Sequence, residues 1–179
     1  MNNGKISIRY ARALYAYALE RGEDKAVYDD MRLVADSLAG VKELAGFLAN
    51  PAAGSEDKER MLLEAAGGDR ACECTRRFMR FALAKNRAAS MRMIALMYAK
   101  LYREKNHIVT GHVTSAAELP SETEEKIAAS LRGKYGMDVE MSAEVDPSLI
   151  GGFILDVDNR RLDASVAGQL QKLNNYAGH

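Results

Sequence analysis

The segment that decides the fold is residues 146–155, Asp-Pro-Ser-Leu-Ile-Gly-Gly-Phe-Ile-Leu, which leads into Leu-Asp-Ala-Ser-Val at 162–166. Pro147 fixes its own φ and holds the residue before it extended. Gly151 and Gly152 permit a positive φ or a close backbone approach at the entry to an apolar run. The segment predicts a turn, a buried strand and a helix start, and it contains no catalytic side-chain set. A chain with such a segment is expected to be a connector rather than an enzyme.

Composition places the chain among ordinary globular proteins. It has 179 residues, of which 47% are hydrophobic and 28% charged. No apolar run approaches the roughly 18 residues that span a bilayer, and the first residues lack the apolar core of a signal peptide. The chain is therefore expected to stay in the cytosol, where it is still able to join a membrane complex. Its two cysteines, Cys72 and Cys74, fit a reducing compartment.

The formal net charge of zero hides an asymmetry. Residues 1–105 carry 19 Lys/Arg and 14 Asp/Glu, a net charge of +5. Residues 106–179 carry 6 Lys/Arg and 11 Asp/Glu, a net charge of −5. A change of sign at a composition boundary suggests two units with different partners.

The first hundred residues show helical periodicity throughout, with apolar residues three and four apart. Six stripes are visible, within residues 6–17, 27–38, 41–48, 61–65, 74–82 and 91–101. Glycines or a proline follow several of them, as is typical of helix ends. Because the connections are short, neighbouring helices are expected to be antiparallel. Residues 1–105 are thus predicted to form a six-helix bundle, which makes the whole chain mostly α.

The pattern changes after a predicted hinge at 103–107. Residues 108–115 predict a strand, and Ser-Glu-Thr-Glu at 121–124 predicts a capping box at the start of a helix. Strict alternation over 137–145 predicts a strand with one wet face, and the apolar run 153–157 predicts another strand. A turn at Asp158-Asn159 and a last helix with Val166, Leu170 and Leu173 complete the pattern. Residues 106–179 are therefore predicted to form a small α+β domain.

An enzymatic reading rests on Cys72 and Cys74, as redox groups or as half of a metal site. Their spacing is not that of Cys-x-x-Cys, and two helical positions so spaced point about 200° apart around the axis. His107 and His112 lie five residues apart, on opposite faces of a strand. Packing cysteines are the favoured interpretation, and no catalytic, cofactor or metal residue is predicted. Activity lost on double substitution to serine would favour the thiol or metal enzyme.

A nucleic-acid reading rests on residues 70–92, which hold seven Lys/Arg and a single acid, Glu73. The alternative function is a helical adaptor that binds nucleic acid through this segment, with affinity that falls steeply as salt is added. No recognition-helix motif is present, and the net charge of the whole chain is zero. A solvated face or a face for a protein partner is the favoured interpretation.

Motifs along nearly the whole chain resemble the delta subunit of bacterial proton-translocating ATP synthase, the homologue of the mitochondrial oligomycin-sensitivity-conferring protein. Each motif is weak alone, but their order and spacing are specific. They are Arg-Tyr-Ala-Arg-Ala-Leu at 9–14, Leu-Ala-Asn-Pro at 48–51, Lys-Asn-Arg at 85–87, Val-Thr-Ser-Ala at 113–116 with Leu119, Asp-Pro-Ser-Leu-Ile-Gly-Gly at 146–152, and Asp-Ala-Ser-Val at 163–166 with Leu170 and Leu173.

The resemblance implies a stator subunit without an active site or cofactor, which couples proton-driven rotation to ATP synthesis by holding the catalytic head still. The N-terminal bundle would receive the N-terminal helix of an alpha subunit, and the C-terminal domain would hold the C-terminal end of the peripheral-stalk b subunit. One copy would sit in the hetero-oligomeric complex at the cytoplasmic face of the cell membrane, with no membrane insertion and no nucleic acid. The acidic C-terminal half is then expected to meet a basic or amphipathic end of b.

Two sets of residues follow from the resemblance. The first set would contact the alpha-subunit helix from the first and fifth helices, with Leu14 left to the core: Tyr10, Ala13, Tyr17, Cys74, Phe78 and Phe81. The second set would shape the C-terminal domain: Asp146, Pro147, Gly151, Gly152, Asp163 and Ser165.

Overall fold

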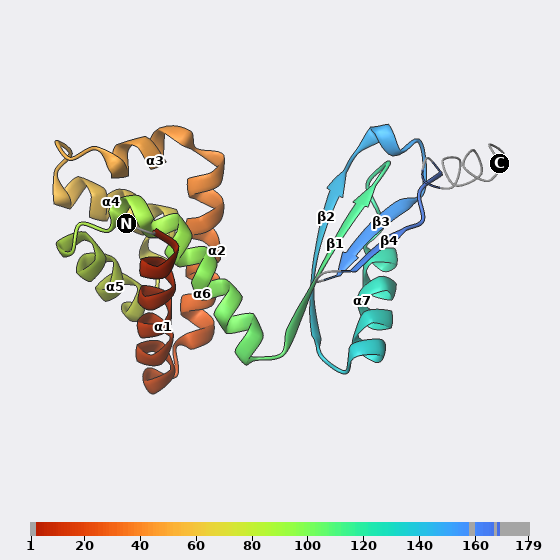
Figure 1. Cartoon of the computed structure of the whole chain (residues 1–179), viewed down its shortest axis with the longest axis horizontal. Coiled ribbons are helices and arrows are strands. Elements are labelled where there is room, and N and C mark those ends of the chain that lie inside the picture. The colour runs from red at the N-terminus through yellow and green to blue at the C-terminus, as the bar shows by residue number, and fades with distance from the viewer. Residues whose placement is uncertain (1–2, 158–159, 167, 169–179) are drawn as a thin grey trace. The chain divides into compact units, whose positions relative to one another are not determined.

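The computed structural model describes residues 3–157, 160–166 and 168, and it separates into two compact units, residues 1–105 and 106–179 (Figure 1). The first unit is helical, and the second combines a helix with a four-stranded sheet. The chain is therefore mostly helical with a small sheet toward its C-terminal end, as predicted. None of the helices in the described ranges is long and apolar enough to cross a membrane.

Helices form in the first unit where the apolar stripes predict them. They are α1 Asn3–Arg21, α2 Asp24–Gly40, α3 Lys42–Ala49, α4 Ser55–Ala65, α5 Glu73–Ala84 and α6 Met91–Lys105, with 3₁₀ turns at Gly68–Arg70 and Ala88–Ser90. Helices α1 and α2 both pack along α6, and α4 packs against α5. These contacts bury one stripe of each helix, which is how amphipathic helices stabilise a unit of this size.

The core of the helical unit is rich in aromatic side chains. Tyr28 and Tyr98 are fully buried, and the Tyr28 ring stacks on Tyr102 with centroids 4.3 Å apart. The Tyr98 hydroxyl donates a hydrogen bond of 3.0 Å to the Asp24 carbonyl oxygen. Burial raises the pKa of Tyr98, so this hydroxyl stays protonated and keeps its role as a donor. The contact ties α6 to the start of α2.

The second unit is built around a sheet with strand order β2-β1-β3-β4. Its elements are β1 Ile108–Ser115, α7 Ser121–Tyr135, β2 Asp138–Val145, a 3₁₀ turn Pro147–Leu149, β3 Phe153–Val157 and β4 Arg160–Asp163. Strands β1 and β2 are parallel, whereas β3 pairs antiparallel with both β1 and β4. A parallel pair requires a crossover connection, and α7 supplies it before ending at the left-handed Gly136.

One face of the sheet forms the core of this unit with α7. Val113, Leu131 and Leu155 are buried together there, and Val139 and Met141 of β2 pack against them. The far end of β2 differs from the prediction, because Val145 is 45% exposed although it lies on the predicted apolar face. Strand β2 is an edge strand of the sheet, so it has a neighbouring strand on one side only.

Two local predictions for the second unit are wrong. Strand β4 was not predicted, and it adds a third consecutive strand ahead of the predicted last helix. The capping box does not form, because Ser121 is already the first residue of α7. The Pro120 carbonyl accepts from the backbone N–H groups of Thr123 and Glu124 instead.

Part of the predicted C-terminal structure cannot be compared. The turn at Asp158-Asn159 and the helix positions Leu170 and Leu173 lie outside the described residues. Val166 is helical, in agreement with a helix start at that point.

Candidate protein-docking site

An apolar groove lies between α1 and α5. It has a volume of about 270 Å³ and is lined by Ala13, Leu14 and Tyr17 from α1 and by Arg77, Phe78 and Phe81 from α5. Leu14 and Phe78 are buried, at 1% and 6% exposure, and form the floor. Phe81 is 51% exposed, which is a large solvent-facing apolar surface for an aromatic side chain.

Tyr10 extends the apolar wall of this groove by one turn of α1. Its ring meets Phe78 edge-on with centroids 6.5 Å apart, and its centroid lies 6.0 Å from that of Phe81. Such aromatic pairs add to the stability that burial alone provides. The three rings therefore form a preorganised cluster at one end of the groove.

The structure brings five of the six residues predicted for alpha-subunit contact to this groove. Ala13, Tyr17, Phe78 and Phe81 line it, and Tyr10 packs on its two phenylalanines. Cys74 does not line it, since it is 1% exposed at the start of α5. Two lining residues were not predicted as contacts: Arg77, and Leu14, which was assigned to the core and is indeed buried although it lines the groove.

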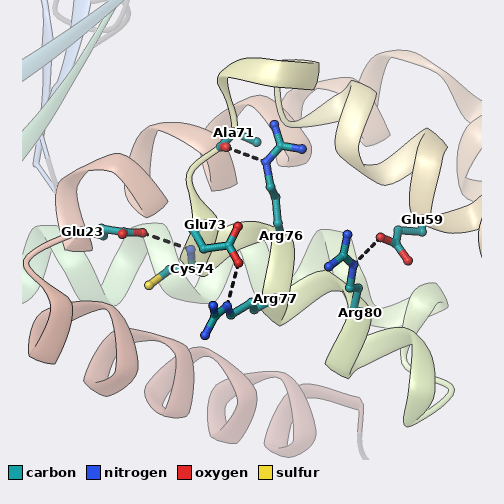
Figure 2. A network of polar contacts seen from close by, with 8 residues as sticks. All are labelled: Glu23, Glu59, Ala71, Glu73, Cys74, Arg76, Arg77 and Arg80. Carbon is teal, nitrogen blue, oxygen red and sulfur yellow. Dashed lines mark hydrogen bonds and ion pairs between the residues drawn. The ribbon is translucent and has the colours of Figure 1, made fainter.

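Carboxylates from outside α5 satisfy the N-terminal end of that helix. Glu23 accepts a hydrogen bond of 3.0 Å from the Cys74 backbone N–H, and Asp30 of α2 accepts one of 2.9 Å from the Cys72 N–H (Glu23 and Cys74 are drawn in Figure 2). The first N–H groups of a helix lack intrahelical partners and attract negative charge. Both carboxylates therefore fix where α5 starts, and through it the position of the α5 wall of the groove.

The pKa of Glu23 lies below its ordinary value of 4.5, chiefly because the Cys74 N–H donates to the carboxylate. A depressed folded-state pKa contributes stability that is complete above the unfolded-state value and lost as pH falls through the folded one. We expect Glu23→Gln to lower the unfolding free energy by about 0.5–1 kcal/mol at pH 7, as helix-terminus charges do. The difference from wild type should shrink below pH 4.5 in thermal melts followed by circular dichroism.

The control is Glu118→Gln, which removes an exposed carboxylate in the loop before α7. If the stability difference between wild type and Glu23→Gln stayed the same at low pH, Glu23 would not be acting as a charged cap of α5.

Three of the seven basic residues in the segment 70–92 have internal partners. Arg76 donates to the carbonyl oxygens of Ala71, Gly68 and Asp69 at 2.8–3.1 Å. Arg80 pairs with Glu59 of α4 at 2.6 Å, and Arg77 pairs with Glu73 at 2.7 Å (Figure 2). A phosphate-binding face requires cations that are free to meet the backbone of a nucleic acid. Arg76 and Arg80 are committed to partners within the chain, which weakens the alternative reading as a nucleic-acid adaptor.

The two cysteines are poor candidates for chemistry. Burial raises the pKa of Cys72 to about 11, and burial together with the Glu23 carboxylate raises that of Cys74 to about 12. The thiolate is the reactive form of cysteine, so neither thiol is activated at neutral pH. Across the ranges that the structure describes, no group of three His, Cys, Asp or Glu residues is placed to hold a metal ion.

The two most distinctive motifs of the sequence meet in the second unit. Asp146 accepts a hydrogen bond of 2.9 Å from the Ser148 N–H. It thereby caps the 3₁₀ turn whose first residue is Pro147. Gly152 follows with φ of 79°, and a side chain there would collide with the Ala164 carbonyl oxygen. The neighbouring Gly151 accepts from the Val166 N–H at 2.9 Å. The segment at 146–152 thus lies directly against the segment at 163–166.

Asp163 and Ser165 complete this junction. The Asp163 carboxylate accepts from the Ser165 backbone N–H at 2.9 Å and from its hydroxyl at 2.6 Å. The Ser165 hydroxyl oxygen accepts from the Gly168 N–H at 3.0 Å, as an N-cap residue does at a helix start. These bonds hold backbone in place rather than a ligand, so the motifs position structure in the second unit.

Comparisons with known proteins agree on one family. The model of the ATP synthase delta (OSCP) subunit family matches residues 6–176. The ATP synthase subunit delta of Parabacteroides distasonis is 39% identical over 173 residues, which cover 97% of this chain and 96% of the relative. That of Phocaeicola vulgatus is 37% identical over 170 residues, which cover 95% and 92%. A chain in the cryo-EM structure of the Toxoplasma gondii mitochondrial ATP synthase hexamer has the same fold, with a TM-score of 0.68 and 21% identity over 100% of this chain and 98% of that one.

An exposed apolar groove between two helices is a surface that suits an amphipathic helix from another protein. The chain belongs to the ATP synthase delta (OSCP) subunit family, which confirms the resemblance seen in its motifs. It is a non-catalytic, structural subunit of the synthase, with a stator role that links the catalytic head to the peripheral stalk.

Proposed function

We propose that this stator subunit receives the N-terminal helix of an alpha subunit in the groove between α1 and α5. The observation that carries the proposal is the open apolar channel itself, with Phe81 51% exposed beside the buried Leu14 and Phe78. A contiguous exposed apolar surface rimmed by polar groups marks a protein-interaction site. An amphipathic helix with apolar residues at i, i+3 or i+4 and i+7 fits a channel between two parallel walls.

The helical unit acts as one six-helix bundle in this proposal. A stator has to resist torque, which calls for binding surfaces on rigid elements. The groove meets that need, because Glu23 binds the backbone at the start of its α5 wall and fixes where that helix begins. Rigid walls reduce the ordering cost that binding would otherwise incur.

The second unit holds the C-terminal end of the b subunit in this proposal. Residues 106–179 carry a net charge of −5, which suits a basic or amphipathic segment. The unit also exposes large apolar side chains that its own core does not use: Val145, Ile150, Leu162 and Val166, at 41–76% exposure. One copy would thus bridge alpha and b at the cytoplasmic face of the membrane, as a peripheral subunit.

The test is direct binding of two synthetic peptides to the full chain, followed by fluorescence anisotropy. One peptide is the N-terminal segment of the alpha subunit from the same synthase, and the other is the C-terminal segment of its b subunit. Both peptides are expected to bind. Saturating amounts of one peptide should not reduce binding of the other. Failure of the alpha peptide to bind, or its displacement by the b peptide, would contradict the assignment of two separate surfaces. Duplex DNA is the control, and no salt-sensitive binding to it is expected.

A further inference from the structure

One end of the groove is marked by two guanidinium groups that bracket Tyr17. Arg77 of α5 lines the groove directly. Arg21, the last residue of α1, lies over the Tyr17 ring with its guanidinium carbon 4.7 Å from the centroid. The other end, at Tyr10 and Phe81, is aromatic. The groove is therefore polarised, with positive charge at the Tyr17 end.

Arg77 differs from the other arginines of α5 in its direction. Figure 2 shows Arg77 on the side of α5 that faces α1, whereas Arg76 and Arg80 leave the helix away from α1. Arg76 donates to backbone carbonyl groups that precede α5, and Arg80 forms an ion pair with Glu59 of α4. Only the Arg77 side chain of these three lines the groove in the described structure.

The bond that Arg77 makes leaves capacity for a second acceptor. Nε of Arg77 donates to Glu73 at 2.7 Å, the nearby Tyr17 side chain also helps to raise the pKa of Arg77, and the side chains of Arg77 and Glu73 are each 54% exposed. A guanidinium has five N–H donors in a planar fork, and its two terminal nitrogens suit a carboxylate. Glu23, an acid near the start of α5, is already engaged by the Cys74 N–H. Within the described part of the chain, Arg21 has its contact with Tyr17 and no ion pair.

We propose that the Tyr17 end of the groove selects an amphipathic helix that carries a carboxylate beside its apolar strip, and that Arg77 receives this carboxylate with Arg21 adding attraction. The proposal rests on the groove being the docking site of the alpha-subunit helix, and it adds the charge and the polarity that this helix must have. The apolar contacts supply most of the affinity, while the charge pair fixes which way the helix lies. Glu73 competes with the partner for the same guanidinium.

The test uses the full chain and two probes: the alpha N-terminal peptide, and a twin in which every Asp and Glu is replaced by Asn or Gln. The variants are Arg77→Gln, Arg80→Gln and Glu73→Gln. Arg80 is the matched control, because it is an exposed, ion-paired arginine on the same helix that faces α4. Dissociation constants are measured at low and high salt, and circular dichroism checks that each variant keeps its helices.

Arg77→Gln is expected to lower the affinity for the parent peptide by about three- to fivefold at low salt, which is the range of solvent-exposed ion pairs. The affinity for the amide twin should not change. The loss should shrink as salt is added. Arg80→Gln should change neither affinity, and Glu73→Gln should tighten the parent by about twofold because it removes the competing carboxylate. A tighter complex is a result that structural damage does not produce.

Equal losses for Arg77→Gln and Arg80→Gln, or an equal loss with the amide twin, would overturn the proposal while leaving the groove as a docking site. An amide twin that binds the wild-type chain as tightly as the parent peptide does would overturn it as well. If neither peptide bound the wild-type chain, the proposed function would fail and this inference with it.

Discussion

Ala13→Asp is expected to weaken binding of the alpha-subunit peptide by about a hundredfold or more, while the chain stays folded. Ala13 lines the groove and is exposed, so an aspartate there is hydrated in the free chain and α1 remains intact. A docked helix would cover the new carboxylate next to Leu14 and Phe78. Burying an unpaired charge costs about 3 kcal/mol or more. Each 1.4 kcal/mol, roughly, corresponds to a tenfold change in affinity.

The control for this experiment is the same substitution at another exposed helical alanine. Ala129 lies on α7 in the other unit, so Ala129→Asp adds the same charge far along the chain from the groove. Affinity is measured by titration with the peptide, and helicity by circular dichroism. Unchanged affinity in Ala13→Asp, or an equal loss of affinity in Ala129→Asp, would show that the alpha-subunit peptide does not bind in this groove.

Gly152→Ala is expected to destabilise the second unit by about 3 kcal/mol or more. The φ of Gly152 is 79°, a conformation that costs an L-residue roughly 1–2 kcal/mol. The added Cβ would also collide with the Ala164 carbonyl oxygen and approach Ser165 Cα to 2.9 Å. Both obstacles are backbone, so relief requires the segments at 146–152 and 163–166 to separate, at a cost typical of overpacking, about 1–3 kcal/mol.

Two other glycines of the same unit serve as matched controls. A methyl group at Gly133 in α7 would meet open space, so Gly133→Ala should stabilise the helix by about 0.5–1 kcal/mol. A methyl group at Gly151 would meet only the Val166 side chain, at 3.2 Å, so its effect should be intermediate. Hydrogen exchange of the β1 and β3 amides in the full chain reports the local unfolding free energy. Equal protection in Gly152→Ala and Gly133→Ala would show that the close approach is not needed.

The helical unit was predictable because each helix carries its own apolar stripe and several of them end at a glycine or before a proline. What local pattern does not reveal is which part of a stripe meets the core and which part meets a partner. Ala13 and Leu14 are neighbours, yet one is exposed in the groove and the other is 1% exposed. Cys74 continues the stripe of Phe78 and Phe81, but Glu23 binds its backbone at the start of α5 and removes it from the groove. That contact spans 51 positions of sequence and leaves no local signal.

Strand β4 escaped prediction for a related reason. Its residues are Arg-Arg-Leu-Asp, a composition with weak strand preference. It forms because the backbone of β3 offers it a ladder, with Leu155 opposite Leu162 and Val157 opposite Arg160. Charged residues are common on edge strands, where they discourage pairing with other chains. The capping box does not form because α7 begins one residue earlier than expected. Pro120, not Ser121, is the N-cap residue, and its carbonyl oxygen accepts the first hydrogen bonds of the helix.

The raised pKa values of the two cysteines have a practical consequence for labelling this protein. With values of about 11 and about 12, on the order of one thiol in several thousand or fewer is ionised near neutral pH. A maleimide dye should therefore react with a cysteine newly placed at an exposed site, such as Ala129, long before it reaches the native pair. Cys74, which is 1% exposed, should then be modified only when the start of α5 opens, so its rate of modification reports that local opening.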